Sequence, residues 1–207
     1  MKREYQLSSH HFKSPKFLSV VGEAIKFFKS TPVVPLPPET RFIGAGVYAL
    51  YYRGSCKHYL HLSKQNRKKC NLPIYVGKAV PPGWRTGRKI TVQTADLYRR
   101  LCEHSKSIRS AKGLNVRDFK CQFVVLSGIE SDLVVPIEAA LIRKFMPLWN
   151  TCVDGFGNHD PGKGRYNQAV SEWDILHPGR TWAKRLKGLS PKKPDILKKI
   201  AHRIETV

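Results

Sequence analysis

Two short tripeptides carry tyrosines that could act together in catalysis. Gly46-Val47-Tyr48 and Tyr75-Val76-Gly77 each lie in an apolar run bounded by glycine or proline. Such runs, rich in aromatic and β-branched residues, are typical of β-strands. If the two strands pair antiparallel, the phenols of Tyr48 and Tyr75 share one face of a small sheet. A pair of phenols can orient or deprotonate a water molecule, although tyrosines in strands more often serve only for packing.

Three further side chains stand out by their type and position. Arg100 and His104 are four residues apart in an expected helix, so they share one of its faces. Glu138 stands in an almost wholly apolar stretch of a second expected helix. A carboxylate there is costly to bury unless a metal ion or a cation lies beside it. The alternative to a metal is a structural ion pair with an arginine, such as Arg143 or Arg100.

The charge of the chain indicates a polyanionic partner. Its 207 residues include 37 lysines and arginines against 15 acidic residues, a formal net charge of +22. Nucleic acid is the partner that most readily explains such self-repulsion in a globular domain. No acidic residue occurs between Thr40 and Ala95, where basic residues are frequent. These basic residues fall mainly in expected loops, which argues against a membrane-binding amphipathic helix.

Length and cysteine usage narrow the class of protein further. A chain of 207 residues with 41% hydrophobic residues suits one domain with elaborations. It has no apolar run of about 18 residues, so we expect no membrane span. Its start lacks the apolar stretch of a signal peptide. Five cysteines, an odd number, favour reduced thiols and a cytoplasmic location.

The elements that must position these side chains follow in the order β-β-α-β-α. Strands are expected over residues 46–52, 72–77 and 120–126. Helices are expected over residues 96–108, with Thr94 as the cap, and over residues 132–146. This order predicts an α+β fold in which a small antiparallel sheet of about three strands is flanked by helices.

Extensions surround this expected core of residues 39–150. Residues 1–38 are interpreted as an N-terminal arm, helical over residues 17–28 and then extended and proline-rich. The arm could pack on the core, embrace DNA or contact a second subunit. Residues 151–207 are interpreted as a basic C-terminal extension packed on the core. It opens with a glycine-rich loop, and a second nucleic-acid surface is expected at Trp173, Trp182, Arg180, Lys184, Arg185, Lys187, Lys192 and Lys193.

Two basic segments lie within the expected core. Residues 53–71 are an insertion between the first two strands, which we expect to be a solvated loop facing phosphates. Residues 81–89, rich in proline, glycine and arginine, predict a mobile basic loop. Both are candidates for contact with nucleic acid.

The ordered set of motifs resembles that of the GIY-YIG nucleases over roughly residues 44–150. The matching residues are Gly46-Val47-Tyr48, Tyr75-Val76-Gly77, Arg100 with His104, Glu138, and Pro147-Leu148-Trp149-Asn150. Valine replaces isoleucine in both tripeptides, which is a minor chemical change. The resemblance implies an active site formed by Tyr48, Tyr75, Arg100, His104, Glu138 and Asn150. It also implies that Glu138 holds a Mg²⁺ cofactor.

The gap between Tyr48 and Tyr75 is much longer than the usual hairpin of that family. Because of this long gap, the heavy positive charge and the extensions, the chain resembles the type II restriction endonucleases of the family that cut a GC-rich palindrome. This resemblance implies a Mg²⁺-dependent endonuclease for double-stranded DNA, a homodimer at least on DNA, in a bacterial cytoplasm. The alternatives are a structure-specific repair or recombination nuclease and a non-catalytic basic DNA-binding protein.

The general base stays open between two residues. Tyr48 could take the proton of the attacking water, but a phenol has an ordinary pKa of about 10. Neighbouring cations such as Lys78 and Arg100 would have to lower that pKa. Otherwise His104 takes the proton. Arg100 would bind a nonbridging phosphate oxygen.

Overall fold

The centre of the molecule is a four-stranded antiparallel sheet with strand order β1-β4-β2-β3. It is seen in a computed structural model that describes residues 6–80, 83–84 and 94–205. The strands are β1 (Val34–Pro35), β2 (Ala45–Tyr52), β3 (Tyr75–Ala79) and β4 (Phe119–Leu126). The predicted α+β class is confirmed. The sheet has one strand more than expected, because the proline-rich connector pairs with β4 as the short strand β1.

The central strand β2 is buried along its whole length. Because side chains alternate across a strand, Tyr48 and Leu50 join one apolar cluster, whereas Val47 and Ala49 join the other. Each face of β2 therefore needs its own covering layer, and every residue of the first tripeptide is held inside the molecule.

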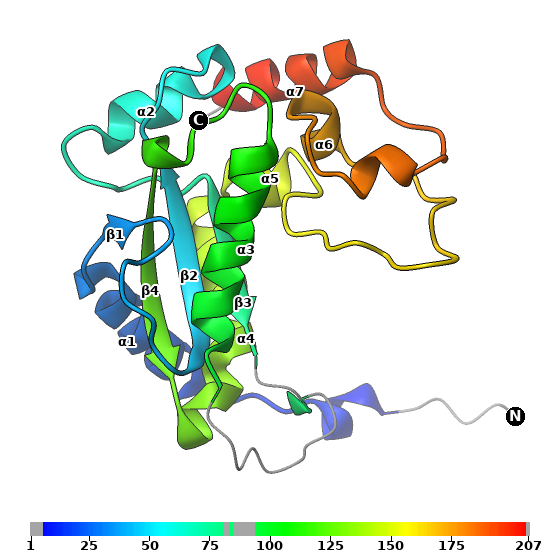
Figure 1. Cartoon of the computed structure of the whole chain (residues 1–207). Helices are drawn as coiled ribbons and strands as arrows, with labels where there is room; N and C mark the ends of the chain where they lie inside the picture. Colours follow the sequence, from blue (N-terminus) through cyan, green and yellow to red (C-terminus); the bar gives the residue numbers. More distant parts are fainter. Residues whose placement is uncertain (1–5, 81–82, 85–93, 206–207) are drawn as a thin grey trace, which may run out of the picture.

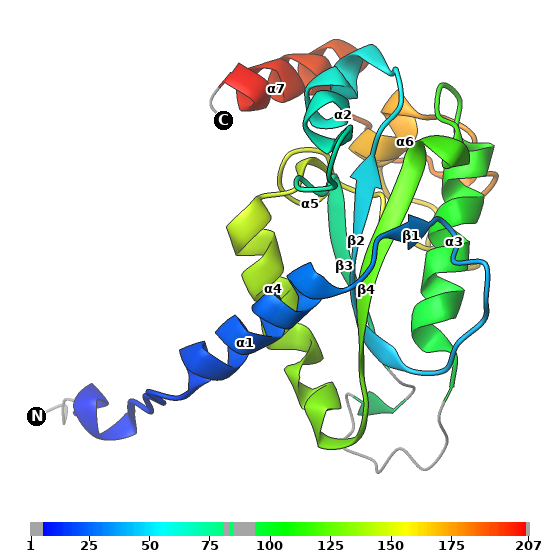
Figure 2. The same cartoon turned by 90° about the vertical axis from the view of Figure 1, so that its left-hand side faces the viewer.

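Helices supply these two layers (Figures 1 and 2). Helix α3 (Asp96–Ser110) covers one face of the sheet, and α1 (Phe17–Ser30) and α4 (Val134–Phe145) cover the other. The cap expected for α3 is wrong. Its N-cap residue is Ala95, while the Thr94 hydroxyl donates a hydrogen bond to the carboxylate of Asp96. Helix α4 ends where Met146 adopts a left-handed conformation, with φ of 43°.

Further helices gather at one end of the sheet (Figure 1). They are α2 (Leu60–Asn66), α5 (Leu148–Thr151), α6 (Glu172–Leu176) and α7 (Lys193–Glu205). The 3₁₀ turns of the described chain are η1 (Leu7–His10), η2 (Lys57–Tyr59), η4 (Val116–Asp118), η5 (Gly128–Leu133) and η6 (Ala183–Arg185). The predicted basic loop of residues 81–89 lies outside the described residues, except for Gly83 and Trp84.

The insertion is not the solvated loop that we expected, because it folds into η2 and α2. Its Tyr59 is buried, and its Asn66 amide donates hydrogen bonds to the carbonyls of Tyr52 and Leu72 at 3.2 and 2.8 Å. The side-chain oxygen of Asn66 accepts from the backbone of Asn71 and Leu72 at 3.0 Å. These four bonds close the insertion onto the end of β2.

The N-terminal arm is partly core and partly surface. Phe28 of α1 is fully buried against α4. The earlier part of the arm extends away from the body (Figure 2) and exposes apolar side chains, with Phe12 90% and Leu18 78% accessible. Among the described helices, none has the length and apolar character needed to cross a membrane.

The expected second nucleic-acid surface is wrong at two positions. Trp173 is fully buried and Arg180 is only 4% exposed, so neither side chain is available to DNA. The remaining cations expected there, such as Lys184 and Lys187, are exposed. All five cysteines are unpaired thiols.

Candidate active site

The pairing of β2 with β3 brings the two phenols together. Tyr48 lies opposite Gly77, and Leu50 lies opposite Tyr75. The rings of Tyr48 and Tyr75 are 6.2 Å apart between centroids. The shared face predicted from the two tripeptides is confirmed. Tyr75 lines an open cavity, whereas Tyr48 lies beneath it with no accessible surface.

Close approaches explain the glycine in each tripeptide. A Cβ atom at Gly77 would lie 2.4 Å from the hydroxyl oxygen of Tyr48. A Cβ atom at Gly46 would lie 2.0 Å from the carbonyl oxygen of Val124 in β4. Real Cβ atoms do not approach other atoms so closely. Glycine therefore lets β4 pack against β2 and lets the buried phenol fit under β3.

The buried phenol has an imidazole as its partner. The Tyr48 hydroxyl is 2.5 Å from Nε2 of His104, which is 2% exposed. Burial lowers the pKa of His104 well below its ordinary 6.5, and the charge of Arg100 lowers it further. The imidazole is therefore neutral at pH 7, and the hydroxyl donates to it.

The condition that Tyr48 would need to act alone as the base, a pKa lowered by nearby cations, is not met. Burial raises this pKa well above 10, and the nearby Tyr75 raises it further. Arg100 acts in the opposite direction by charge and by hydrogen bonding, but burial outweighs it. Tyr48 is thus protonated at neutral pH, and His104 is the neutral hydrogen-bond acceptor of the pair.

Arg100 stands between α3 and the C-terminal segment. Its Nη2 donates to the carbonyl oxygen of Gly157 at 2.7 Å. Its Nη1 donates to Oε2 of Glu103 at 3.0 Å and to Nε2 of His159 at 2.5 Å. The expectation that Arg100 and His104 share a helix face is confirmed, because both reach the tyrosine pair.

Glu138 reaches the site around the free edge of β3. It pairs with Lys78, which projects from β3 toward α4, so its partner is a lysine rather than the expected arginine. The reason is geometric, since alternation on β3 turns Lys78 away from the tyrosine face and toward α4. The Glu138 carboxylate nevertheless lines the same cavity as Tyr75 and Arg100.

Asn150 holds the edge strand in place. Its side-chain oxygen accepts from the backbone N–H of Val76 at 2.7 Å, and its amide donates to the carbonyl oxygen of Val76 at 2.8 Å. The amide thereby acts as a neighbouring strand for one residue of β3. Asn150 supports the site through Val76 and is not among the cavity's lining residues.

The cavity at this edge has a volume of about 540 Å³. Its polar lining includes Tyr75, Lys78, Arg100, Glu103, Glu138 and His159. Within the described residues no group of three or more histidine, cysteine or acidic side chains is arranged to hold a metal. Mg²⁺ needs no such cage, because it is commonly held by one or two carboxylates together with waters and substrate phosphate. The Glu138 carboxylate has several acceptor sites, and its bond to Lys78 leaves others open to the cavity.

Sequence reasoning missed His159 and Gly157. Both lie in the glycine-rich stretch that was predicted only as a loop, and both contact Arg100. The only signal in the sequence was weak: a histidine between asparagine and aspartate, shortly after the last motif residue, Asn150. Such a loop shows no periodicity, so the sequence does not predict where its side chains point.

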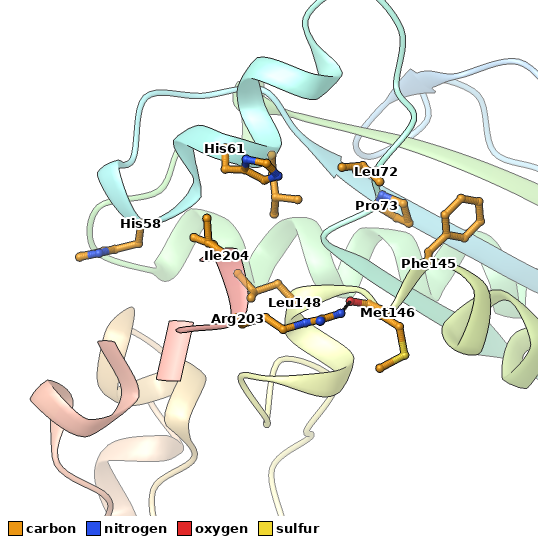
Figure 3. Close-up of a pocket in the computed structure, with 10 residues that line it drawn as sticks. His58, His61, Leu72, Pro73, Phe145, Met146, Leu148, Arg203 and Ile204 are labelled. Atoms are coloured by element: carbon orange, nitrogen blue, oxygen red, sulfur yellow. Dashed lines mark hydrogen bonds between the residues drawn. The ribbon is translucent and has the colours of Figure 1, made fainter. Parts of the chain in front are cut away.

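A second pocket lies between the insertion, the end of α4 and α7 (Figure 3). It is small, about 60 Å³, and mainly apolar. The figure shows the ring of His58 turned away from the ring of His61, while Leu148 and Arg203 close the opposite wall. These groups do not converge on a common point, so this pocket does not rival the cavity at β3.

A sheet that pairs the two tripeptides on β2 and β3, with α3 and α4 on its two faces, is the fold of a GIY-YIG nuclease. The family model described as Eco29kI GIY-YIG domain matches residues 40–204, about four fifths of the chain. The protein therefore belongs to this family of restriction endonucleases. A comparison with curated proteins gives no match.

Proposed function

We propose that the protein is a type II restriction endonuclease that hydrolyses both strands of double-stranded DNA at a palindromic site, with Mg²⁺ as cofactor. The observation that carries the proposal is the convergence of Tyr75, Arg100 and Glu138 on one open cavity, with the Tyr48–His104 pair directly beneath it. The net charge of +22 supplies the attraction to a polyanion.

Proton transfer in this proposal uses the buried pair. The bond that forms joins the water oxygen to phosphorus, and the bond that breaks joins phosphorus to the 3′ oxygen. The Tyr48 hydroxyl accepts the proton of the attacking water while its own proton moves to Nε2 of His104. A neutral imidazole can accept this proton, and the phenol never has to ionise fully in a buried place.

Charge stabilisation comes from the groups around the cavity. Arg100 binds a nonbridging phosphate oxygen, for which its planar fork of donors is suited. A Mg²⁺ ion held by Glu138 would supply positive charge for the phosphate and for the departing 3′ oxygen. Lys78 pairs with the Glu138 carboxylate and helps to hold it at the cavity.

Cutting both strands of a palindrome requires two sites related by a two-fold axis, so we propose a homodimer on DNA. The exposed apolar side chains of the arm, such as Phe12 and Leu18, offer surface for a second subunit. Base readout is assigned to arginines and lysines of residues 53–71 and of the segment after Asn150. The division into an arm (residues 1–38), a core (39–150) and an extension (151–207) is part of this proposal, as is a bacterial cytoplasmic location.

The test is digestion of a sequenced plasmid by the purified protein, with Mg²⁺ and then with EDTA, followed by sequencing of the fragment ends. Discrete fragments with one common palindromic end in Mg²⁺, and intact plasmid in EDTA, support the proposal. Cleavage restricted to branched or damaged DNA would favour a repair nuclease. Binding without cleavage in Mg²⁺ would favour a non-catalytic DNA-binding protein.

A further inference from the structure

A buried arginine organises the loop that follows the last family motif. Both oxygens of the Asp174 carboxylate accept from Arg180, at 2.6 and 2.5 Å. The remaining donors of Arg180 bind the carbonyl oxygens of Gly155, Phe156 and Asn158, at 2.8 to 3.2 Å. With every N–H group engaged, the guanidinium fixes the backbone of residues 155–158 from inside.

Aromatic rings complete this support. The guanidinium of Arg180 lies between the rings of Trp173 and Trp182, 4.6 Å from each centroid. In the loop itself, Phe156 is buried and stacks on His104, with centroids 4.5 Å apart and planes at 17°. The loop is therefore packed against the base of the active site and is not a free surface connection.

The same loop delivers His159 to Arg100. An arginine can only donate hydrogen bonds, so Nε2 of His159 must accept in the 2.5 Å contact with Nη1. Burial and the charge of Arg100 lower the pKa of His159, which agrees with a neutral ring. A neutral imidazole with an accepting Nε2 carries its proton on Nδ1, which leaves one N–H donor on the ring.

Both terminal nitrogens of Arg100 already have partners within the protein. Nη1 is shared between Glu103 and His159, and Nη2 is bound to Gly157. A phosphate oxygen can reach Nη1 only where one of its partners gives way. Of the two partners of Nη1, Glu103 lies on the same helix three residues from Arg100, whereas the side chain of His159 comes from a separate loop, is 65% exposed and lines the cavity. His159 is thus the partner best placed to move.

We propose that His159 is an additional substrate-contacting residue of this nuclease. Its Nε2 holds the place on Arg100 that a nonbridging phosphate oxygen would take, and once the phosphate displaces it, the Nδ1–H of the ring donates to that phosphate. The inference rests on the proposed function, because it requires a scissile phosphate in the cavity. It assigns to the C-terminal loop a direct part in the reaction.

Three substitutions at position 159 test the assignment. His159→Gln can place an amide group near Nε2, His159→Asn reaches only as far as Nδ1, and His159→Ala removes both positions. We expect His159→Ala and His159→Gln to lower the single-turnover cleavage rate at least about tenfold, and His159→Asn, which keeps an N–H at the Nδ1 position, to retain most of it. DNA affinity, measured with Ca²⁺ in place of Mg²⁺, should not weaken for His159→Ala, because the substitution also removes the competitor for Arg100. His202→Ala, at an exposed histidine of α7, is the matched control and should cleave at the wild-type rate.

Cleavage by His159→Ala at the wild-type rate would overturn the assignment, as would equal losses in the Asn and Ala variants. A second readout separates this inference from the proposed function. The ring-nitrogen NMR resonances of His159 should shift when a DNA duplex is added in EDTA, where no cleavage occurs. If the wild-type protein cuts no DNA, the proposed function fails. The NMR titration is then done with a duplex of mixed sequence, and its result decides whether His159 contacts DNA. Unchanged resonances at saturating duplex would contradict contact between His159 and DNA.

Discussion

The hydroxyl of Tyr48 and Nε2 of His104 are 2.5 Å apart, and neither residue has appreciable contact with solvent. A phenol in this position keeps its proton, since burial raises its pKa. The imidazole lacks a second proton, since burial lowers its pKa. The two residues therefore act as one donor–acceptor unit, and removing either should have similar consequences.

Substitution of either member of this pair should suppress cleavage. We expect Tyr48→Phe and His104→Ala each to lower the single-turnover rate about a hundredfold or more, because a positioned general base contributes about that much. The double variant should be little slower than the worse single variant, since both belong to one proton path. Tyr51→Phe is the control. It removes another buried hydroxyl, 2.7 Å from Gln122 on the opposite face of β2, and should lower stability while leaving the rate unchanged.

The carboxylate of Glu138 should decide the metal dependence. Glu138→Gln keeps the shape of the side chain and an acceptor for Lys78, so its melting temperature should stay close to that of the wild type. We expect its cleavage to be lost at Mg²⁺ concentrations that saturate the wild type, and EDTA to abolish wild-type cleavage. Glu103→Gln alters another carboxylate of the same cavity and should leave the Mg²⁺ titration midpoint in place. A wild-type Mg²⁺ response in Glu138→Gln would contradict the assigned role.

Gly77 should tolerate no side chain. A methyl group there would meet the hydroxyl of Tyr48 at 2.4 Å and the ring of Tyr75 at 2.9 Å. Gly77→Ala must therefore displace a buried ring, at a cost of about 1–3 kcal/mol in unfolding free energy, and should also lower cleavage. Gly22→Ala is the matched control. Nothing lies within 4 Å of the place that its methyl group would take in α1, so alanine should raise stability by about 0.5–1 kcal/mol. Chemical denaturation of the two variants measures both effects.

Asn150 should matter through the strand that it supports. Asn150→Ala leaves the N–H and the carbonyl of Val76 without their partner, a loss of about 1–3 kcal/mol for each buried group left unpaired. Asn150→Asp retains the acceptor for the Val76 N–H but sets a carboxylate oxygen against the Val76 carbonyl oxygen, so it should also be destabilising. Hydrogen exchange at the Val76 amide should accelerate in Asn150→Ala. Unchanged exchange there would show that β3 does not depend on this side chain.

The free energy of unfolding should decrease as the pH is lowered, because the protein buries a neutral histidine. His177 is buried, its Nε2 is 2.6 Å from the hydroxyl of Tyr59, and burial lowers its pKa from 6.5 to about 4. The stabilisation that the neutral His177 provides is fully present above pH 6.5, where the residue is neutral in both the folded and the unfolded chain. It is lost as the pH falls toward 4, because the unfolded chain takes up the proton first. The full loss is on the order of 3 kcal/mol. Melting temperatures at pH 7.5 and pH 5 should differ less for His177→Phe than for the wild type.

The elements that could be predicted from the sequence are those with clear local patterns. The strands that carry Tyr48 and Tyr75, and the helix that carries Arg100 and His104, have apolar periods and breakers that act over a few residues. Their order was enough to predict the α+β sheet and the shared phenol face. The helical insertion was missed because its fold depends on Asn66, whose four hydrogen bonds reach across the segment to both ends.

The unforeseen parts of the site depend on contacts between distant segments. Lys78 meets Glu138 around the edge of β3, across sixty residues of chain. His159 meets Arg100 only because Arg180 draws the intervening loop inward. The direction of the Tyr48 pKa shift also follows from depth, which composition does not reveal. Each of these features becomes visible only once the layers are packed.

The buried Arg180 has a practical consequence for protein engineering. A DNA-cutting module trimmed after Asn150, at the end of the recognisable motifs, would lose the ring that covers His104 and the groups that steady Arg100. A chimera that transplants this catalytic unit onto a different DNA-reading partner must therefore carry the chain through at least Trp182.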